Sequence, residues 1–336
     1  MREGSRSAWA VIAVILFVLL GFSALLNFLF LASRGKKHET PETIFTEQSF
    51  AGDTSATDKI AVVDVKGLIT KMSEGATGRD GMVGDIKQEL KLATEDKDVK
   101  AIIVRIDSPG GEVLASDEIY NAVLKAKEKK KLLVSMGSVA ASGGYYIAVG
   151  SDYIMADELT ITGSIGVIMQ TLNYRGLMDK VGLQTYTFKS GKFKDLLNGA
   201  REPSPEEMQL VQSLVMETYD KFVGIVAKRR KMDVEALKTG LADGRILSGT
   251  QAKAAGFVDE LGDFDTAVER AKAQAGITKA KVVQYVVPFS LGRLFGLGSK
   301  AGVPLFNKSV QLDLNVGPQQ LPLEQGKMYF LASPLM

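Results

Sequence analysis

The strongest constraint on this chain is an uncharged, apolar run from Ala8 to Ala32, in which Ser23 and Asn27 are the only strongly polar residues. A helix that crosses the hydrocarbon core of a bilayer needs about 20 such residues. The run therefore predicts one N-terminal transmembrane helix at 8–32, preceded by a short N-terminus at 1–7. A cleaved signal peptide is the alternative, but its apolar region would be shorter, and residues 28–33 offer no good small-x-small cleavage site.

The charges beside the predicted helix do not fix its orientation. They are Arg2, Glu3 and Arg6 before the helix and Arg34, Lys36 and Lys37 after it. Lys and Arg favour the cytoplasmic side of a membrane. Because the larger positive count follows the helix, the charges lean slightly towards a cytoplasmic location for the rest of the chain, without deciding it.

Two residue counts exclude whole classes of chemistry. The chain has one histidine, His38, in a polar stretch just past the apolar run, and it has no cysteine. A Ser-His-Asp triad, a thiol nucleophile, a disulfide and a His or Cys metal cluster are therefore excluded. The near balance of 41 Lys+Arg against 39 Asp+Glu lacks the basic excess of a nucleic-acid-binding protein. We expect no nucleic acid, no metal and no organic cofactor, and any hydrolytic chemistry must use Ser, Thr, Asp, Glu, Lys or Tyr.

The rest of the chain divides into a linker, one folded domain and a tail. Residues 33–58 are polar and predict a solvated linker. From 59 to 280, short apolar runs alternate with helical patterns, which indicates an α/β domain with a largely parallel sheet. Residues 281–336 show no clear periodicity, so we expect an extended or peripheral tail. The predicted strands are 60–65, 101–106, 132–136 and 153–156, and the predicted helices are 83–93, 117–130, 265–274 and one that starts at Ser204 with a capping box to Glu207.

Clusters of glycine and serine follow two of the predicted strands. Residues 107–111 read Asp-Ser-Pro-Gly-Gly, which is either a backbone cradle for an oxyanion or a tight turn between strand and helix. Residues 137–146 surround Ser142 with small neighbours. A helix that begins near this serine would stabilise negative charge beside its hydroxyl, as acyl transfer requires, although a packing site between helix and sheet has the same composition. Ser138 is the competing nucleophile.

A serine nucleophile in a chain without a suitable histidine needs another base, and a lysine with a neutral amine is the reasonable candidate. Desolvation can lower a lysine pKa by several units from its reference of about 10.4. Lys189, Lys192 and Lys194 lie in one short segment, and their spacing does not choose among them. A solvated basic loop is the alternative interpretation of this segment. Ser164, between two glycines, could orient such a lysine through its hydroxyl or simply form a turn.

Taken in order, these clusters resemble the signal peptide peptidase A family of serine proteases in its short bacterial form. The family pattern places the nucleophile at Ser142 and the general base at Lys194. It also places the serine that orients the lysine at Ser164 and the oxyanion donors at the backbone N–H groups of Gly111 and Gly143. The matching segments are DSPGG at 107–111, SMGSVAASGGYY at 135–146, TGSIGV at 162–167, KSGKFKD at 189–195 and DGRILSGTQAKAAGFVDELG at 243–262.

The resemblance implies a Clp-protease/crotonase-like fold and a membrane-bound serine endopeptidase that degrades remnant signal peptides with small and apolar side chains near the cut. It further implies a homo-oligomeric ring in which the serine and the lysine come from neighbouring subunits, with no cofactor. The N-terminus at 1–7 would then be cytoplasmic and the catalytic domain extracytoplasmic, which overrides the ambiguous charges. No family motif matches the tail after Gly276, and its final residues, Ala-Ser-Pro-Leu-Met, suggest a segment that enters a neighbouring site as a substrate or plug.

Three other functions fit parts of the same pattern. A related membrane protease that uses a Ser/Lys dyad to cut stomatin-like partners would differ in the peptide segments that it cleaves. A catalytically silent oligomeric scaffold in the membrane would leave Ser142 unlabelled by a serine-reactive probe. A crotonase-like acyl-CoA enzyme would bind CoA, but a membrane anchor and a Ser/Lys pair are not expected there.

Overall fold

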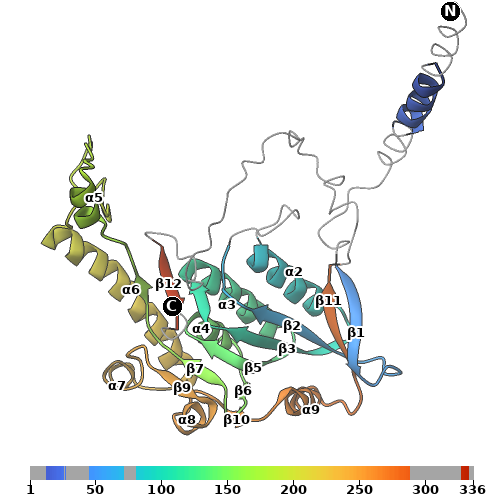
Figure 1. Ribbon diagram of the computed structural model, residues 1–336. Helices are drawn as coiled ribbons and strands as arrows, with labels where there is room; N and C mark the ends of the chain where they lie inside the picture. The colour runs from blue at the N-terminus through green and yellow to red at the C-terminus, as the bar shows by residue number, and fades with distance from the viewer. Residues whose placement is uncertain (1–12, 26, 28–44, 72–80, 288–326, 333–336) are drawn as a thin grey trace, which may run out of the picture. The chain divides into compact units, whose positions relative to one another are not determined.

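A computed structural model of the chain describes residues 13–25, 27, 45–71, 81–287 and 327–332 (Figure 1). The chain divides into two compact units, 1–44 and 45–336. In the first unit, residues 13–25 are helical. Within the described ranges no helix is long and apolar enough to cross a membrane. Residues 8–12, 26 and 28–32 of the predicted span lie outside the described residues.

The second unit is an α/β domain on one largely parallel sheet, as the alternation of apolar runs and helical patterns predicts. Its strand order is β1-β11-β2-β3-β5-β6-β10, and β7 pairs with both β5 and β9. Among the described strands of this sheet, only the β1–β11 and β7–β9 pairs are antiparallel. The strands are β1 Thr46–Gly52, β2 Lys59–Lys66, β3 Val99–Ser108, β5 Lys131–Ala141, β6 Ile154–Ala156, β7 Ile161–Gly163, β9 Ile246–Ser248, β10 Glu260–Leu261 and β11 Lys281–Val286.

Helices cover both faces of this sheet, because successive residues of a strand point to opposite sides. On one face, Ala61 and Val63 of β2 belong to the core that includes α2, α3 and α4. On the other face, Ile60 and Val62 pack with α9. Burial on both faces explains why the central strands read as near-continuous apolar runs. The helices are α2 Gly81–Glu95, α3 Val113–Lys127, α4 Gly143–Ala148, α5 Arg175–Val181, α6 Pro205–Arg230, α7 Val234–Thr239, α8 Gly249–Ala254 and α9 Phe264–Ala275.

The structure differs from the sequence prediction at both ends of the domain. The linker was expected to reach residue 58, but β1 pairs with β11, so the folded unit begins at Phe45. Every residue of β1 is exposed, which explains why its sequence lacks an apolar pattern. The tail was expected to be peripheral from residue 281, but β11 pairs with β2, and a final strand, β12 Met328–Leu331, is almost entirely buried.

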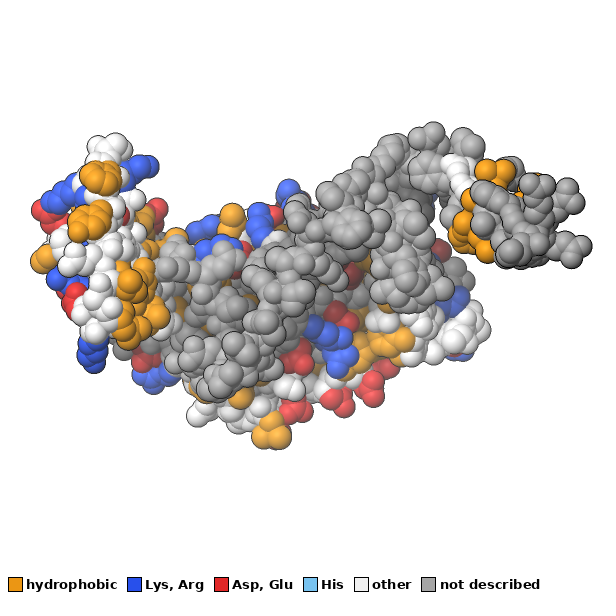
Figure 2. Space-filling model, turned by 45° about the horizontal axis from the view of Figure 1, so that its top comes forward, with side chains coloured by type: hydrophobic (Ala, Val, Ile, Leu, Met, Phe, Trp, Pro, Cys, Tyr) orange, Lys and Arg blue, Asp and Glu red, His pale blue; other side chains and the backbone are white. Residues whose placement is uncertain are grey.

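The apolar side chains of the long helix α6 are buried only in its C-terminal half. Phe222 and Val226 lie in the core, whereas Met208 and Leu214 nearer its N-terminus are exposed. Residues 170–203, which we call the arm, precede α6 and contain α5 (Figure 1). Apolar side chains gather on the arm and the adjacent half of α6, at the left of Figure 2. The most exposed apolar side chains of the arm are Leu172, Leu177, Val181, Leu183, Tyr186 and Phe188.

Candidate active site

Ser142 occupies a strained turn between a strand and a helix. It follows the last residue of β5 and is the N-cap of α4, with φ 53° and ψ −112°. A non-glycine residue with positive φ is uncommon, and such conformations cost about 1–3 kcal/mol and concentrate at functional sites. The main chain holds the turn, since the Ser142 N–H donates to the Gly163 carbonyl and its own carbonyl accepts from the Tyr146 N–H, both at 2.8 Å.

The hydroxyl of Ser142 is buried without a partner. The residue has no exposed surface, and within the described part of the chain Oγ makes no hydrogen bond. Leaving a buried hydroxyl unpaired costs about 1–3 kcal/mol, so its persistence points to a function. Ser138, the competing nucleophile, is exposed on β5 and lacks this setting.

Glycines bring the backbone of a second segment against Ser142. A Cβ atom at Gly143 would lie 3.1 Å from the Gly110 Cα, 3.2 Å from the Gly111 nitrogen and 2.6 Å from the Ser116 hydroxyl. Gly110 has φ 105°, a conformation that other residues rarely adopt. The start of α4 and the short strand β4, Gly110–Glu112, therefore meet backbone to backbone beside the serine. This closeness suits main-chain N–H groups that stabilise an oxyanion.

The C-terminal strand β12 lies along β4. It pairs antiparallel with β4, with Phe330 opposite Gly111, and antiparallel with β8, Ile168–Met169. The Phe330 side chain is fully buried, and its ring centroid is 4.9 Å from that of Tyr146 and 4.8 Å from that of Phe222. A chain in extended conformation thus fits between β4 and β8. Sequence reasoning missed the contact between β12 and β4 because more than two hundred residues separate Phe330 from Gly111.

Ser164 belongs to the same turn region as the nucleophile. It is buried, has φ 51°, and follows Gly163, the residue whose carbonyl holds the Ser142 N–H. Its own N–H donates to the Arg245 carbonyl at 2.8 Å. Asp107 also supports this region, because its Oδ1 accepts from the Val139 N–H on β5 at 3.0 Å. Ser142, Ser164, Gly111 and Gly143 are thus brought together.

Lys194 lies elsewhere, in a turn of the arm. The turn follows Gly191, whose carbonyl accepts from the Lys194 N–H at 3.2 Å. The Lys194 side chain is exposed and makes no hydrogen bond or ion pair with any residue that the structure describes. Within one chain, the predicted base therefore stands in the exposed arm, apart from the buried serine site.

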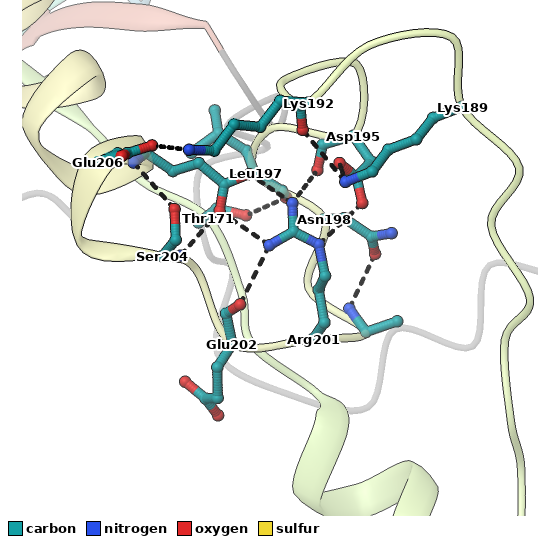
Figure 3. Close-up of polar contacts among 12 residues, drawn as sticks. Thr171, Lys189, Lys192, Asp195, Leu197, Asn198, Arg201, Glu202, Ser204 and Glu206 are labelled. Carbon is teal, nitrogen blue, oxygen red and sulfur yellow. Dashed lines mark hydrogen bonds and ion pairs between the residues drawn. The ribbon is translucent and has the colours of Figure 1, made fainter.

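Around this turn the arm is held by ion pairs (Figure 3). Asp195 accepts from Lys189 Nζ at 2.7 Å and from Arg201 Nε at 2.8 Å, and the guanidinium of Arg201 holds the pKa of this carboxyl well below its usual range. Arg201 also binds Glu207, whose pKa it lowers to about 2 together with the Ser204 N–H. The capping box between Ser204 and Glu207 confirms the helix start predicted from the sequence. Arg201 carried no sequence signal beyond opposite charges at short spacing.

The chain is similar to known proteases over most of the described domain. Residues 125–278 match the sequence profile of Peptidase family S49, and residues 70–160 match that of Clp protease. A protein of Synechocystis assigned as a protease is 43% identical over 229 residues, which cover 68% of this chain and 79% of that protein. A protein of Enterococcus faecium assigned as a signal peptide peptidase SppA is 45% identical over 198 residues, which cover 59% of this chain and 57% of that protein.

Two further comparisons cover smaller shares. The chloroplastic serine protease SPPA of Arabidopsis thaliana is 35% identical over 239 residues, which cover 70% of this chain and 35% of that protein. Among solved structures, ClpP1 of Listeria monocytogenes is similar over 62% of this chain and 94% of its own, with a TM-score of 0.41 and 18% identity.

Proposed function

The chain belongs to Peptidase family S49, and we propose that this serine endopeptidase is anchored in the cell membrane and degrades remnant signal peptides with a Ser142/Lys194 dyad. The observation that carries the proposal is the strained, buried Ser142, whose hydroxyl has no partner in the described part of the chain. A hydroxyl kept in this state beside the backbone of Gly111 and Gly143 is arranged to attack a carbonyl rather than to stabilise the fold.

The reaction proceeds through an acyl-enzyme. The neutral amine of Lys194 accepts the proton of the Ser142 hydroxyl as Oγ attacks the scissile carbonyl, and the N–H groups of Gly111 and Gly143 hold the oxyanion. Lys194 returns the proton to the amine of the departing peptide. The acyl group stays on Ser142 as an ester. Lys194 then activates a water that hydrolyses this ester and frees the serine. Ser164 orients the lysine amine through its hydroxyl.

A second copy of the chain supplies the missing half of the dyad. The amine of Lys194 is exposed on the arm, and the arm and the adjacent half of α6 expose apolar side chains such as Leu177 and Phe188. Docking of the arm on a neighbouring copy would bury this apolar surface and bring the amine to the neighbour's Ser142. The same burial would favour the neutral form of the lysine by desolvation. The active form is therefore a homo-oligomer with dyads shared between subunits.

Substrate is bound as an extended chain between β4 and β8. The support is β12, which pairs with both strands and lies directly along the glycines beside Ser142. A peptide in this position would gain main-chain hydrogen bonds that do not depend on its sequence, together with contacts for alternate side chains. Membrane attachment at 8–32 and an extracytoplasmic domain would place this groove where apolar signal-peptide remnants remain.

The test is acyl-probe labelling and peptide hydrolysis by the full chain in detergent, with Ser142→Ala and Lys194→Ala as variants. We expect a fluorophosphonate adduct on Ser142 in the unsubstituted protein and in neither variant. Mixing the two inactive variants should restore part of the activity, because some sites then combine an intact serine with an intact lysine from a neighbour. Absence of any adduct in the assembled protein would favour the scaffold function instead, and substrate profiling would separate signal-peptide remnants from stomatin-like targets.

A further inference from the structure

The residue next to the proposed base is fixed in place by contacts that the reaction itself does not use. Asp195 follows Lys194, and both oxygens of its carboxylate are occupied, Oδ1 by Lys189 at 2.7 Å and Oδ2 by Arg201 Nε at 2.8 Å. Arg201 also donates through Nη2 to the Asp195 carbonyl at 3.2 Å. One guanidinium thus binds both the side chain and the main chain of the residue beside Lys194 (Figure 3).

The other side of the same guanidinium binds the first turn of α6. Arg201 Nη1 donates to Glu207 Oε2 at 2.8 Å, and Nη2 donates to the other oxygen of that carboxylate. The Ser204 N–H donates to Glu207 at 2.7 Å, so the carboxylate is held by the helix cap as well. The side chains of Asp195 and Glu207 are only 9% and 5% exposed, whereas exposed ion pairs hold their geometry poorly. A planar, forked guanidinium between two such carboxylates defines a direction as well as a distance.

The turn that carries Lys194 requires such support. Near the lysine, main-chain hydrogen bonds from the N–H groups of Lys194, Leu196 and Asn198 join residues three apart, at 3.1 to 3.2 Å. Leu197 adopts φ 64°, a backbone conformation that residues other than glycine rarely occupy. By contrast, the far half of α6 is packed in the core through Phe222 and Val226. Arg201 therefore connects a loosely bonded turn to a helix whose C-terminal half is held in the core.

We propose that Arg201 is a positioning residue for Lys194: by bridging Asp195 and Glu207 it fixes the lysine turn on α6, so that the amine reaches Ser142 of a second copy in reactive geometry. This inference rests on the proposed function. Arg201 is not one of the reacting groups. It acts through Asp195, the residue that follows Lys194, whose side chain and main-chain carbonyl it binds. A displacement of about 1 Å at a reacting group can cost on the order of 100-fold in rate, which sets the size of the expected effect.

The test is peptide hydrolysis by the full chain carrying Arg201→Met, with kcat and KM determined separately. We expect kcat to fall about 10- to 100-fold with KM within about threefold of the unsubstituted protein and with the oligomer size unchanged.

Two variants serve as controls. Glu206→Gln removes the neighbouring ion pair between Lys192 and Glu206, whose side chains are 62% and 61% exposed, and it should leave kcat and KM unchanged. Arg201→Lys keeps the charge but not the fork, so kcat should recover only in part.

The proposal is overturned if Arg201→Met retains the original kcat, or if KM and the oligomer size change together with kcat, as a general loss of structure would give. If Arg201→Met does not assemble, Asp195→Asn decides the question, because it keeps the shape of the side chain and removes the charge that Arg201 holds. In that variant kcat should fall with KM unchanged, and an unchanged kcat overturns the proposal. Activity that survives in Ser142→Ala or Lys194→Ala would instead refute the proposed function, whatever Arg201 does.

Discussion

The serine side and the lysine side of the site are built in opposite ways. On the serine side, the end of β5, β4 and α4 are buried, and glycines let main-chain atoms meet directly beside Ser142. On the lysine side, the arm is exposed, and Lys194 depends on ion pairs around Asp195 and Arg201. Packing thus fixes the serine side when a single chain folds. Ion pairs fix the lysine side only relative to its immediate neighbours in the arm and α6.

This difference has a consequence for control of the chemistry. In the mechanism that we propose, the serine side is complete in one chain except for its base. The lysine side would gain a desolvated environment only when a second copy covers it. A single chain would therefore fold without being active, and the two sides should respond differently to substitution, truncation, acid and removal of charge.

The largest effect should come from Ser142→Gly. Loss of the nucleophile should lower peptide hydrolysis by on the order of 10³-fold or more. Stability should rise, by about 1 kcal/mol in the free energy of unfolding, because glycine accepts φ 53° and the unpaired hydroxyl is removed. Denaturant unfolding checks the change in stability, with Ser138→Gly on the preceding strand β5 as the control that should retain activity. A less stable Ser142→Gly would contradict the idea that the serine side is strained for function.

A smaller effect is expected from ending the chain after residue 326, which removes β12. Hydrolysis of short peptides should rise several-fold, since β4 and β8 lose the strand that pairs with them. Stability should fall by about 3–5 kcal/mol, because the buried ring of Phe330 leaves its contacts with Tyr146 and Phe222. Cutting after Ala280 would be a poorer test, as it would also remove β11 from the main sheet.

Phe330→Ala separates the two parts of that result. It should lower stability by a similar amount while keeping the strand that covers β4, so the rise in hydrolysis should be smaller than in the shortened chain. Unchanged hydrolysis in the shortened chain would show that β12 does not compete with substrate.

Acid should loosen the lysine side before the serine side. Arg201 lowers the pKa of Glu207 from 4.5 to about 2, and it lowers that of Asp195 in the same direction. Because these pKa values are depressed in the folded chain, the stabilisation is fully present above pH 4.5 and is lost as pH falls towards 2. Hydrogen exchange, corrected for its intrinsic rate, should therefore increase in the arm while β4, β5 and α4 remain protected. Glu207→Gln should make exchange in the arm fast at every pH in this range.

The smallest effect should follow from Lys192→Met. Lys192 of the arm pairs with Glu206 in the first turn of α6, but both side chains are mostly exposed. Such pairs contribute about 0–1 kcal/mol, so the free energy of unfolding should change by less than about 1 kcal/mol and the difference should vanish in concentrated salt. A larger change would mean that the lysine side is held by its surface charges in general rather than by the Asp195–Arg201–Glu207 bridge.

Features set by neighbours in the sequence could be predicted, and features set by distant partners could not. The strands around Val63 and Val104 were evident because burial on both faces leaves apolar runs, and Ser204 with Glu207 forms the expected capping box. β12 was not evident, because its partners at Gly110–Glu112 lie far back in the chain and its four residues have no period of their own. β1 escaped notice because an exposed edge strand needs no apolar pattern.

The site followed the same rule. Small residues around Ser142 indicated a close backbone contact, and the choice of Lys194 among three lysines came from the family resemblance alone. The sequence could not show that this lysine stands on a separate arm, since neither its neighbours nor its spacing records where a segment of 34 residues points. Arg201 was missed because an ion pair is recognisable only when its partners are known to be close.

The length of α6 determines how far Lys194 lies from the core of its own chain. The helix has 26 residues, which corresponds to about 39 Å along its axis, and only its far half is packed in the core. Adding one turn to the exposed half would displace the lysine by about 5.4 Å and keep its rotational phase nearly unchanged. In the assembly that we propose, this one dimension would set the spacing between subunits, so insertions or deletions in α6 should change the curvature of the oligomer.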